Sequence, residues 1–499
     1  MKKQIVALAA CGMWAGAAMA QEPFDLGAAL LPPPAAPGPR VQPFVKQPAG
    51  KIAIIHVRVI DGTGGPAQSD MTVLLDGGKI AAVQPASSAL PAGYATIDGT
   101  GHSLIPGIVG MHDHQFRMVL PNLSEEGYDQ PKLTDEMIFS TPRLSLAAGV
   151  TTLRTTGALE AYVDLNMKQA IDAGELPGPH MDITGPYLQG AHSQAFPMHH
   201  LSGPDEARRL VDYWAGVGMT SFKAHKDIPL ADLKAGVEEA HKLGRKFAAH
   251  LCAVTYPDAI AAGIDSIEHG FWYNTQLQAD KVPDVCPRTN GEETLLAMEP
   301  GGEDAKALIK LLIDNRVAMT STLALFELAY APEYRLRTPR QVAVMSPEVR
   351  EEYLLQLYGR QIEDPAVTAH SNAMWQRELA LEKEFFDAGG LLMAGPDPTG
   401  WGDVIAGFGD QRAIELLVQA GLTPVQAIKV GTLNGATYLG VDDRIGSIAA
   451  GKNADLVLVS GDPSSRIEDI ENVVTVFKDG VGYDPEKLLA TVQGAYGRY

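Results

Sequence analysis

The chain has 499 residues, with 40 basic and 60 acidic side chains, a formal net charge of -20 and 45% hydrophobic residues. This length exceeds one small domain and suits one large α/β domain with a smaller domain beside it. The hydrophobic content excludes global disorder, and the acidic balance without a basic stripe excludes nucleic acid as an expected partner.

Residues 1–20 have the pattern of a secretory signal. Two lysines precede a run of apolar and small residues, which ends in the small-x-small cleavage pattern Ala-Met-Ala at 18–20. The pattern predicts a periplasmic or secreted protein. The stretch ending at Cys11 also resembles a lipoprotein cleavage box, which is the less favoured alternative because the apolar run before it is short. No later stretch reaches the ~18 apolar residues of a membrane span.

Two cysteines remain after this segment, Cys252 and Cys286. An oxidising compartment permits a disulfide between them. Sequence alone leaves both a single bridge and two free thiols open.

Residues 21–50 are rich in proline, with seven prolines between positions 32 and 48. This composition predicts an extended tether that does not pack, so that ordered structure begins at Lys51.

Both ends of the remaining chain are rich in strand patterns. Residues 51–104 read as short strands, with a hairpin turn at Asp-Gly-Gly 76–78. After a helix predicted over 423–437, which starts with a Thr-Pro cap, residues 439–499 return to strands, at 445–459 and 473–478. We expect the two ends to combine into one small β-sandwich satellite domain.

Between these ends, over residues 105–438, the rhythm is strand, loop and helix. The eight candidate strands predict an α/β fold of the (β/α)8 TIM-barrel type. The alternative, an open doubly wound sheet, lacks a Gly-x-Gly-x-x-Gly turn after a strand. Two insertions exceed the barrel minimum and are expected to cover a site or contact a partner, 275–303 and 330–388. The strands are predicted at 105–112, 150–155, 180–184, 219–225, 246–251, 265–269, 317–322 and 391–396.

The first of these strands ends in His112-Asp113-His114. Alternate side chains of a strand share a face, so His112 and His114 are expected to point the same way. Two imidazoles side by side at the end of a buried strand are a start for a metal site, although hydrogen-bonded core histidines give the same pattern.

Further polar side chains close four other candidate strands: Lys223, His250, His269 and Asp397. In a barrel, the C-terminal strand ends form the active site. A lysine at the end of an apolar strand costs free energy unless it is paired or modified. Each residue alone has an ordinary structural explanation, but together they predict one site.

These motifs carry a resemblance. Over roughly residues 50–480 the chain resembles the amidohydrolase superfamily, metal-dependent hydrolases on a (β/α)8 barrel, and within it the imidazolonepropionase-like and prolidase-like members. Besides Lys223 and His250, the matching pieces are Leu-Ile-Pro-Gly-Ile-Val-Gly-Met-His-Asp-His at 104–114, Ala-Gly-Val-Thr-Thr at 148–152, Gly-Ile-Asp-Ser-Ile-Glu-His-Gly at 263–270, Gly-Pro-Asp at 395–397 and Gly-Ser-Ile-Ala-Ala-Gly-Lys-Asn-Ala-Asp-Leu-Val at 446–457.

The resemblance implies a site with two divalent metal ions, Zn2+ being the first expectation for nitrogen and oxygen ligands. Asp397 would also be the catalytic proton shuttle, and a CO2-derived carbamate on Lys223 would bridge the two ions. The implied ligands are His112, His114 and Asp397 for one metal, and His250 and His269 for the other.

Three further residues are weaker candidates. His192, after the third strand, is placed to polarise a substrate carbonyl or support the leaving group, with a surface-loop histidine as the alternative. Tyr256 could contact the substrate through its hydroxyl, with a packed tyrosine as the alternative. His225 shares a face with Lys223 and could compete as a ligand. Where relatives often carry an aspartate after the second strand, this chain has Thr155-Thr156-Gly157.

The sequence therefore predicts a secreted binuclear amidohydrolase that cleaves an amide bond of dipeptides or N-acyl amino acids. A cyclic amide, lactone or ester hydrolase on the same site is the alternative, and a deaminase is less favoured because mononuclear deaminases of the superfamily lack the bridging lysine. A periplasmic binding protein without catalysis is the alternative of another class. The expected partner is a small-molecule substrate, with homo-oligomerisation left open.

Overall fold

A computed structural model describes residues 24–119, 123–124, 127–128, 134–191, 198–399 and 401–498. The predicted signal segment, the alternative at Cys11 and the candidate His192 lie outside the described residues. Within the described part of the chain, no helix is both long enough and apolar enough to span a membrane.

Eight parallel strands alternate with helices and coincide in order with the eight predicted strands. The first three form a sheet in the order β13-β12-β7, and the other five form a sheet in the order β14-β15-β16-β17-β18. The α/β class is thereby confirmed. The strands are β7 (Ile108–Asp113), β12 (Val150–Thr155), β13 (His180–Ile183), β14 (Ser221–Ala224), β15 (Lys246–Ala249), β16 (Ser266–Glu268), β17 (Ala318–Ser321) and β18 (Leu392–Ala394).

Backbone contacts link the two parallel sheets at both pairs of edges. Next to β13 and β14, a parallel bridge joins Thr184 to Ser221. On the other side, the backbone N–H of Asp397, just after β18, donates to the carbonyl of His112 in β7 at 2.9 Å. The ends of β7 and β18 therefore lie beside one another, although they are far apart in sequence.

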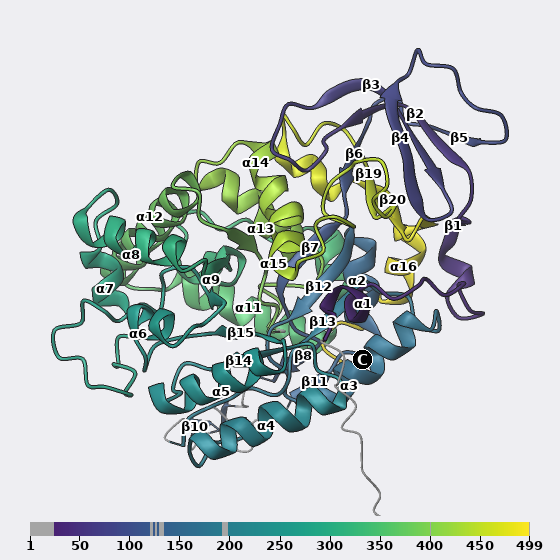
Figure 1. Cartoon of the computed structure of the whole chain (residues 1–499). Coiled ribbons are helices and arrows are strands. Elements are labelled where there is room, and N and C mark those ends of the chain that lie inside the picture. Colours follow the sequence, from purple (N-terminus) through teal and green to yellow (C-terminus); the bar gives the residue numbers. More distant parts are fainter. Residues whose placement is uncertain are drawn as a thin grey trace, which may run out of the picture.

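Helices follow most of these strands and surround them (Figure 1). The Thr-Pro start predicted at residue 423 is confirmed, because Thr423 accepts from the N–H of Gln426 in a capping box. The predicted helix continues as a π-helical turn (Val430–Asn434) and a second α-helix. The helices are α2 (Ser140–Ala147), α3 (Ala161–Asp172), α4 (Pro204–Val217), α5 (Leu230–Lys242), α6 (Tyr256–Ala261), α8 (Glu303–Asp314), α9 (Leu323–Tyr330), α13 (Phe408–Gln419), α14 (Pro424–Lys429), α15 (Gly435–Leu439) and α16 (Pro485–Thr491).

The two predicted insertions contain helices of their own. The first, over 275–303, contains α7 (Glu292–Ala297), and the second, over 330–388, contains α10 (Pro339–Val344), α11 (Pro347–Gln361) and α12 (Pro365–Asp387). Short pairings lie in the segment that follows β7: β8 (Phe116–Met118) with β11 (Thr134–Glu136), and β9 (Leu123–Ser124) with β10 (Gly127–Tyr128).

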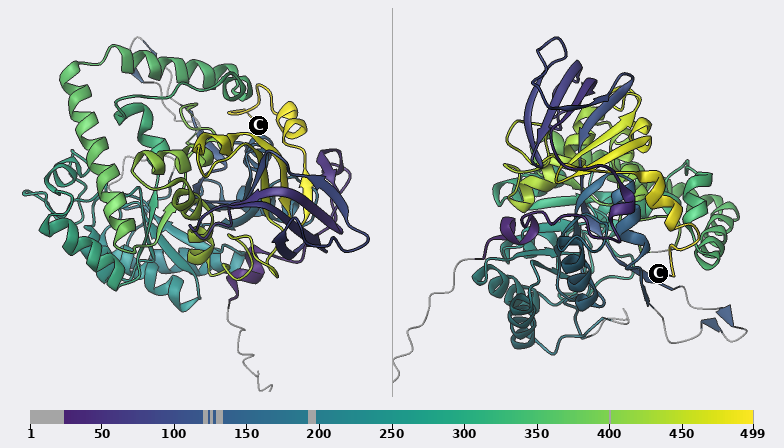
Figure 2. Two further views of the ribbon diagram at one scale, coloured as in Figure 1. Left: turned by 90° about the horizontal axis from the view of Figure 1, so that it is seen from above. Right: turned by 90° about the vertical axis from the view of Figure 1, so that its right-hand side faces the viewer.

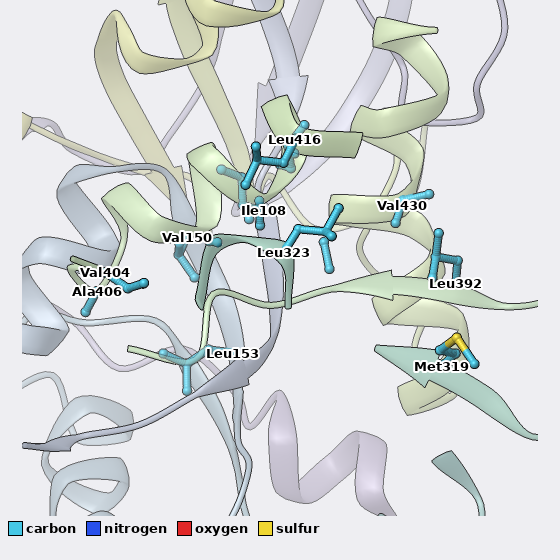
Figure 3. Packing of buried hydrophobic residues seen from close by; sticks show 14 of the residues in the cluster. Ile108, Val150, Leu153, Met319, Leu323, Leu392, Val404, Ala406, Leu416 and Val430 are labelled. Atoms are coloured by element: carbon cyan, nitrogen blue, oxygen red, sulfur yellow. The ribbon is translucent and has the colours of Figure 1, made fainter. Parts of the chain in front are cut away.

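The main core lies between the parallel strands and their helices. Ile108 of β7, Val150 and Leu153 of β12, and Leu416 of α13 belong to one buried cluster and are at most 2% exposed (Figure 3). Parallel strands are covered on both faces, so every residue of β7 and β12 is buried. The buried positions include charged side chains, among them Arg154 in β12 and Glu268 in β16.

A second, nine-stranded sheet is built from both ends of the chain (Figures 1 and 2). Its centre is the antiparallel pairing of β6 with β19, from Pro106 opposite Leu456 to His102 opposite Ser460. Hydrogen bonding connects the strands into one sheet, and their arrangement as a sandwich stays a prediction. The strands are β1 (Val45–Gln47), β2 (Ile52–Val59), β3 (Gln68–Asp76), β4 (Lys79–Pro85), β5 (Ala95–Asp98), β6 (His102–Pro106), β19 (Leu456–Ser460), β20 (Val473–Lys478) and β21 (Val481–Tyr483), with the 3-10 helix η3 (Ile467–Glu471) between β19 and β20.

The predicted non-packing tether is wrong for the part of residues 21–50 that the structure describes. This segment forms α1 (Leu26–Leu30), a 3-10 turn η1 (Gln42–Phe44) and β1, which pairs with β21. Leu30 and Phe44 are 0% and 7% exposed. The apolar residues between the prolines provide enough hydrophobic burial to hold the segment against the protein. The proline content alone does not indicate this burial.

Candidate metal centre

The ends of β7, β14, β15, β16 and β18 bring together all six residues predicted as metal ligands. Five of them are at most 5% exposed: His112, His114, Lys223, His269 and Asp397. The sixth, His250, is partly exposed as a residue, but its Nε2 atom is buried and has no hydrogen-bond partner in the described part of the chain.

Asp397 lies at the centre of this cluster. Its Oδ1 is 3.0 Å from Nε2 of His114, and its Oδ2 is 3.6 Å from Nε2 of His112 and 3.7 Å from Nδ1 of His269. Ligand atoms of His112, His114 and Asp397 all lie within 4.8 Å of one another. Such a spacing allows one ion to be held by all three residues.

The other three residues adjoin this group. Nζ of Lys223 is 3.1 Å from Nε2 of His112. The ring of His269 lies 4.7 Å from that of His112 and 4.3 Å from that of His250, measured between centroids. The nitrogen and oxygen atoms thus form one continuous group that extends from His114 to His250.

Unusual backbone geometry accompanies this group. His269 and Asp397 have φ angles of 69° and 54°, in the left-handed region that non-glycine residues rarely adopt. Strained residues of this kind cluster at functional sites. Gly395 has no side chain for a steric reason, because a Cβ there would lie 2.3 Å from the backbone nitrogen of His112.

Electrostatics favour the protonation states that a metal requires. Burial and the charge of Lys223 lower the pKa of His112 to about 4. Burial, together with neighbouring histidines, lowers the pKa values of His250 and His269 well below the ordinary value. Burial alone would raise the pKa of Asp397, but the surrounding imidazoles outweigh it and hold this pKa well below normal. Neutral imidazoles and an ionised carboxylate are ligand forms.

Two charged residues of this region were not predicted. Glu268 is 0% exposed and its Oε2 is 2.8 Å from Nδ1 of His112. Arg154, 1% exposed, donates to Oε1 of Glu268 at 2.7 Å. The position of Glu268 directly before His269, inside an apolar strand, was a sequence signal that could have drawn attention to it.

Two tyrosines line the cluster and were also not predicted. The hydroxyl of Tyr187 is 3.4 Å from Nε2 of His114, and Nζ of Lys223 lies 5.4 Å above its ring. The ring of Tyr273 lies 4.1 Å from that of His250. Both residues follow strands in irregular segments, where the strand pattern gave no signal.

His225, the predicted competitor of Lys223, lies close to the cluster. Its ring is 5.0 Å from that of His250, and its Nδ1 accepts a hydrogen bond at 2.8 Å from the side-chain amide of Gln189. Burial and the charge of Lys223 lower its pKa to about 3.

Tyr256 has a different environment from the one expected. Its side chain is fully buried, and its hydroxyl donates to the backbone carbonyl of Gly270 at 2.8 Å. The hydroxyl therefore anchors the turn after His269. The other substrate-contact candidate, His192, lies outside the described residues.

Cys252 and Cys286 form a disulfide, which settles the alternative that the sequence left open. The bridge attaches the first insertion to the segment just after β15. Two hydrogen bonds reinforce it: the hydroxyl of Thr275 donates to the carbonyl of Cys252 at 2.9 Å, and Nζ of Lys281 donates to that of Ala253 at 2.6 Å. The segment that follows His250 is thereby held in place.

A second group of possible ligands lies at the opposite, N-terminal end of the parallel strands: His180, Asp455 and Asp479. Nε2 of His180 is 3.1 Å from Oδ2 of Asp479, and Nζ of Lys478 is 3.5 Å from the same oxygen. A lysine thus already supplies positive charge to this group, which connects β13 with the nine-stranded sheet as an ion-pair network.

The profile of the family described as "Amidohydrolase family" matches residues 103–279 and 398–481, more than half of the chain. Curated relatives match only over short segments. The chain is 45% identical over 47 residues to adenine deaminase 1 of Latilactobacillus sakei, which is 9% of this chain and 8% of that protein. It is 39% identical over 58 residues to 5'-deoxyadenosine deaminase of Methanobrevibacter smithii, or 12% and 13% of the two chains. The chain therefore spans only a small part of these relatives.

Solved structures resemble the whole fold. A Bifidobacterium longum protein proposed to be a prolidase has a TM-score of 0.63 at 22% identity, covering 89% of this chain and 99% of its own. A Xaa-Pro dipeptidase with methionine bound in its active site has a TM-score of 0.64 at 20% identity, covering 87% and 100%. A bottromycin amidohydrolase has a TM-score of 0.66 at 19% identity, covering 94% and 96%. At 19% to 22% identity, these likenesses show the fold. The family match, which includes the ends of β7, β14, β15 and β16, shows that the chain belongs to the amidohydrolase family.

Proposed function

We propose that this protein is a secreted binuclear amidohydrolase that cleaves an amide bond of dipeptides or N-acyl amino acids. The observation that carries the proposal is the convergence of four imidazoles, one carboxylate and one lysine at the ends of five parallel strands. An N/O donor set of this kind at buried strand ends suits divalent cations.

We further propose that the eight parallel strands close into a (β/α)8 barrel, with the nine-stranded sheet as a satellite domain. The bridge between Thr184 and Ser221 and the hydrogen bond from Asp397 to His112 support closure, because they join the free edges of the two parallel sheets. The cluster would then lie at the C-terminal mouth of the barrel, where active sites of this architecture are found.

The residues present fit two metal ions. The donor set contains no thiolate, the buried Nε2 of His250 has no hydrogen-bond partner among the described residues, and the pKa values of His112, His250 and His269 are lowered. In this proposal His112, His114 and Asp397 hold one ion, and His250 and His269 hold the other. Zn2+ is the first choice for such ligands. When bound, a metal pair supplies a water of lowered pKa and polarises the substrate carbonyl.

Lys223 is proposed to bridge the two ions as a carbamate. The residue is 2% exposed, and burial lowers the pKa of its amine to about 8, which increases the neutral fraction that can react with CO2. The carbamate would place a carboxylate-like group within reach of His112. An ammonium at that position could not act as a metal ligand.

Asp397 is proposed as the proton shuttle. Its carboxylate is held ionised by the imidazoles around it, so it can accept the proton of the attacking water. It then gives this proton to the leaving amine. Tyr187, next to His114, is placed to donate to a developing oxyanion through its hydroxyl.

The substrate class rests on two supports. The prolidase-like motifs of the sequence and the structural similarity to a Xaa-Pro dipeptidase both favour a small acyl amino acid or dipeptide. Secretion rests on the predicted signal segment, and the disulfide between Cys252 and Cys286 is consistent with an oxidising compartment.

The proposal is tested by metal analysis and a substrate screen. Purified protein reconstituted with Zn2+ and bicarbonate should contain about two ions per chain, following the ligand count of a binuclear site. It should release free amino acids from a library of dipeptides and N-acyl amino acids. About one ion per chain, or fewer, would contradict the binuclear site.

A deaminase is the second candidate, because the short matches to adenine and 5'-deoxyadenosine deaminases give it specific support. Ammonia release from adenine or adenosine derivatives, with no cleavage of any acyl amino acid, would favour it over the main proposal. If the protein hydrolyses only lactones, esters or cyclic amides, the alternative of a cyclic amide, lactone or ester hydrolase on the same site is favoured instead.

A further inference from the structure

We propose that Glu268 is a positioning residue that fixes the tautomer and ring orientation of His112, and that Arg154 holds Glu268 in place for this purpose. The inference rests on the proposed function only in taking His112 as a metal ligand. It concerns metal affinity, and the identity of the substrate does not enter it.

The geometry determines which ring nitrogen of His112 carries the proton. A neutral imidazole has one N–H and one acceptor nitrogen, and an ionised carboxylate only accepts hydrogen bonds. Oε2 of Glu268 is 2.8 Å from Nδ1 of His112, so the proton is on Nδ1. Nε2, on the other side of the ring, then directs its lone pair toward Lys223 and Asp397, at 3.1 and 3.6 Å.

Arg154 closes this arrangement into a ring of contacts. Its guanidinium donates to Oε1 of Glu268 at 2.7 Å, and its Nη2 and Nε donate to the backbone carbonyl of Met111 at 2.7 and 2.9 Å. Met111 directly precedes His112. The same guanidinium thus holds both the backbone beside His112 and the carboxylate bound to its side chain, so neither can rotate independently of the other.

The guanidinium is itself fixed by two neighbouring strands. Arg154 donates to the hydroxyls of Ser266 in β16 and Thr320 in β17, both at 3.2 Å. Ser266 also donates to Oε1 of Glu268 at 3.0 Å. The network therefore spans β7, β12, β16 and β17, inside the region that the parallel strands enclose.

The charges show why this pair is separate from the ligand set. Glu268 and Arg154 are 0% and 1% exposed, and a buried carboxylate without a partner would be costly. Arg154 balances the charge of Glu268. The carboxylate of Glu268 contacts Nδ1 of His112, whereas Nε2 of the same ring faces the other proposed ligands. Asp397 has the opposite arrangement, because it faces the imidazoles directly.

A carboxylate on the outer nitrogen of a metal-binding histidine fixes the ring and raises its basicity. Losing such a partner typically costs about 10- to 100-fold in metal affinity or activity. We therefore expect Glu268→Gln, which keeps the shape and removes the charge, to weaken metal binding by about 10- to 100-fold.

The matched control is Glu415→Gln. Glu415 is also buried, with 1% of its side chain exposed, and also forms an ion pair with an arginine, since Nη1 of Arg412 is 2.7 Å from it. Both substitutions break a buried Glu–Arg pair and should lower the melting temperature. Only Glu268→Gln should change the dissociation constant for Zn2+, measured by chelator competition, and the absorption spectrum of Co2+-substituted protein.

A double-mutant cycle with His112→Ala tests whether Glu268 acts through His112. In that background, Glu268→Gln should change metal affinity by less than about twofold, because the ring that it orients is gone. If Glu268→Gln does not fold, Arg154→Lys replaces it, since a lysine keeps the charge but cannot grip both Glu268 and Met111.

Unchanged affinity in Glu268→Gln, or an equal loss with and without His112, would overturn the inference. Both outcomes are read from metal binding without substrate. A protein that binds metal in this way but cleaves no amide would refute the proposed function and leave the role of Glu268 standing.

Discussion

Nε2 of His114 lies 3.0 Å from Oδ1 of Asp397, so residues at the ends of β7 and β18 meet although most of the parallel strands lie between them in sequence. This contact, with those to His112 and His269, places one carboxylate among three imidazoles. The arrangement gives Asp397 two roles, as a ligand and as a proton carrier, which different substitutions can separate.

Asp397→Asn should keep a ligating oxygen but lose the ability to accept a proton. We expect kcat to fall by about 10²- to 10⁴-fold, the usual contribution of general acid–base catalysis. Most of the bound metal should remain, as measured by elemental analysis. Asp403→Asn is the control, because Asp403 is also buried and its carboxylate accepts a hydrogen bond from the adjacent backbone N–H of Val404. Turnover within about twofold of wild type in Asp397→Asn would remove its role as shuttle.

Lys223→Ala should remove the proposed bridge and weaken binding of the second metal. Turnover should fall by about 100-fold or more, because a group that stabilises the transition-state charge is lost. Short carboxylates such as acetate or propionate should replace the lost carboxylate group and restore part of the activity and of the second metal. Lys226→Ala, which removes a nearby lysine that binds Asn290, is the control and should respond to neither addition. An Lys223→Ala variant with full activity and two metals would rule out the carbamate.

Cys286→Ser should lower the free energy of unfolding without a large change in the packing of the core. The disulfide closes a segment of 34 residues, and the chain-entropy estimate for a loop of this length is about 3–4 kcal/mol. Denaturant unfolding should show this loss, and a reductant should lower the stability of wild type but not of the variant. Equal free energies of unfolding for the Cys286→Ser variant and for wild type without reductant would contradict the prediction.

Stability should fall as pH rises toward neutrality because of Asp164 in α3. Burial raises the pKa of Asp164 to about 7, although a hydrogen bond with Thr155 acts in the opposite direction. The unfolded chain ionises near the ordinary value of 3.8, so from about pH 4 to pH 7 unfolding releases a proton and becomes easier as pH rises.

The Asp164→Asn variant lacks this group. Its free energy of unfolding relative to wild type should therefore increase with pH across that window, by up to about 1.4 kcal/mol per pH unit. Denaturant titrations at pH 5, 6 and 7 measure the difference. Parallel pH profiles for the two proteins would show that Asp164 does not behave in this way.

The order of the eight parallel strands could be predicted from sequence because short strand patterns alternate with helical ones, and several strands follow a glycine at the end of a helix. The predicted ligands could be recognised because Lys223, His250 and Asp397 lie near or just after the C-terminal ends of predicted strands. Their convergence depends on the architecture, which the repeated strand and helix pattern also indicated.

Other features depend on which strands lie opposite one another, and a linear pattern does not contain this information. The contact between Glu268 and His112 joins β16 to β7, which belong to different parallel sheets. The packing of residues 24–50 was hidden by their proline content, although Leu30 and Phe44 are buried. Tyr256 follows His250 closely in sequence, yet its hydroxyl binds the backbone of Gly270.

The pairing of β6 with β19 has a consequence for biosynthesis. On a translating ribosome, β6 emerges long before residues 456–460 exist, and it must wait with one edge unpaired. Exposed strand edges recruit other strands, so the nascent chain needs either a chaperone or delayed compaction until its last strands are made. Truncation before β19 should therefore yield aggregated material rather than a smaller folded enzyme.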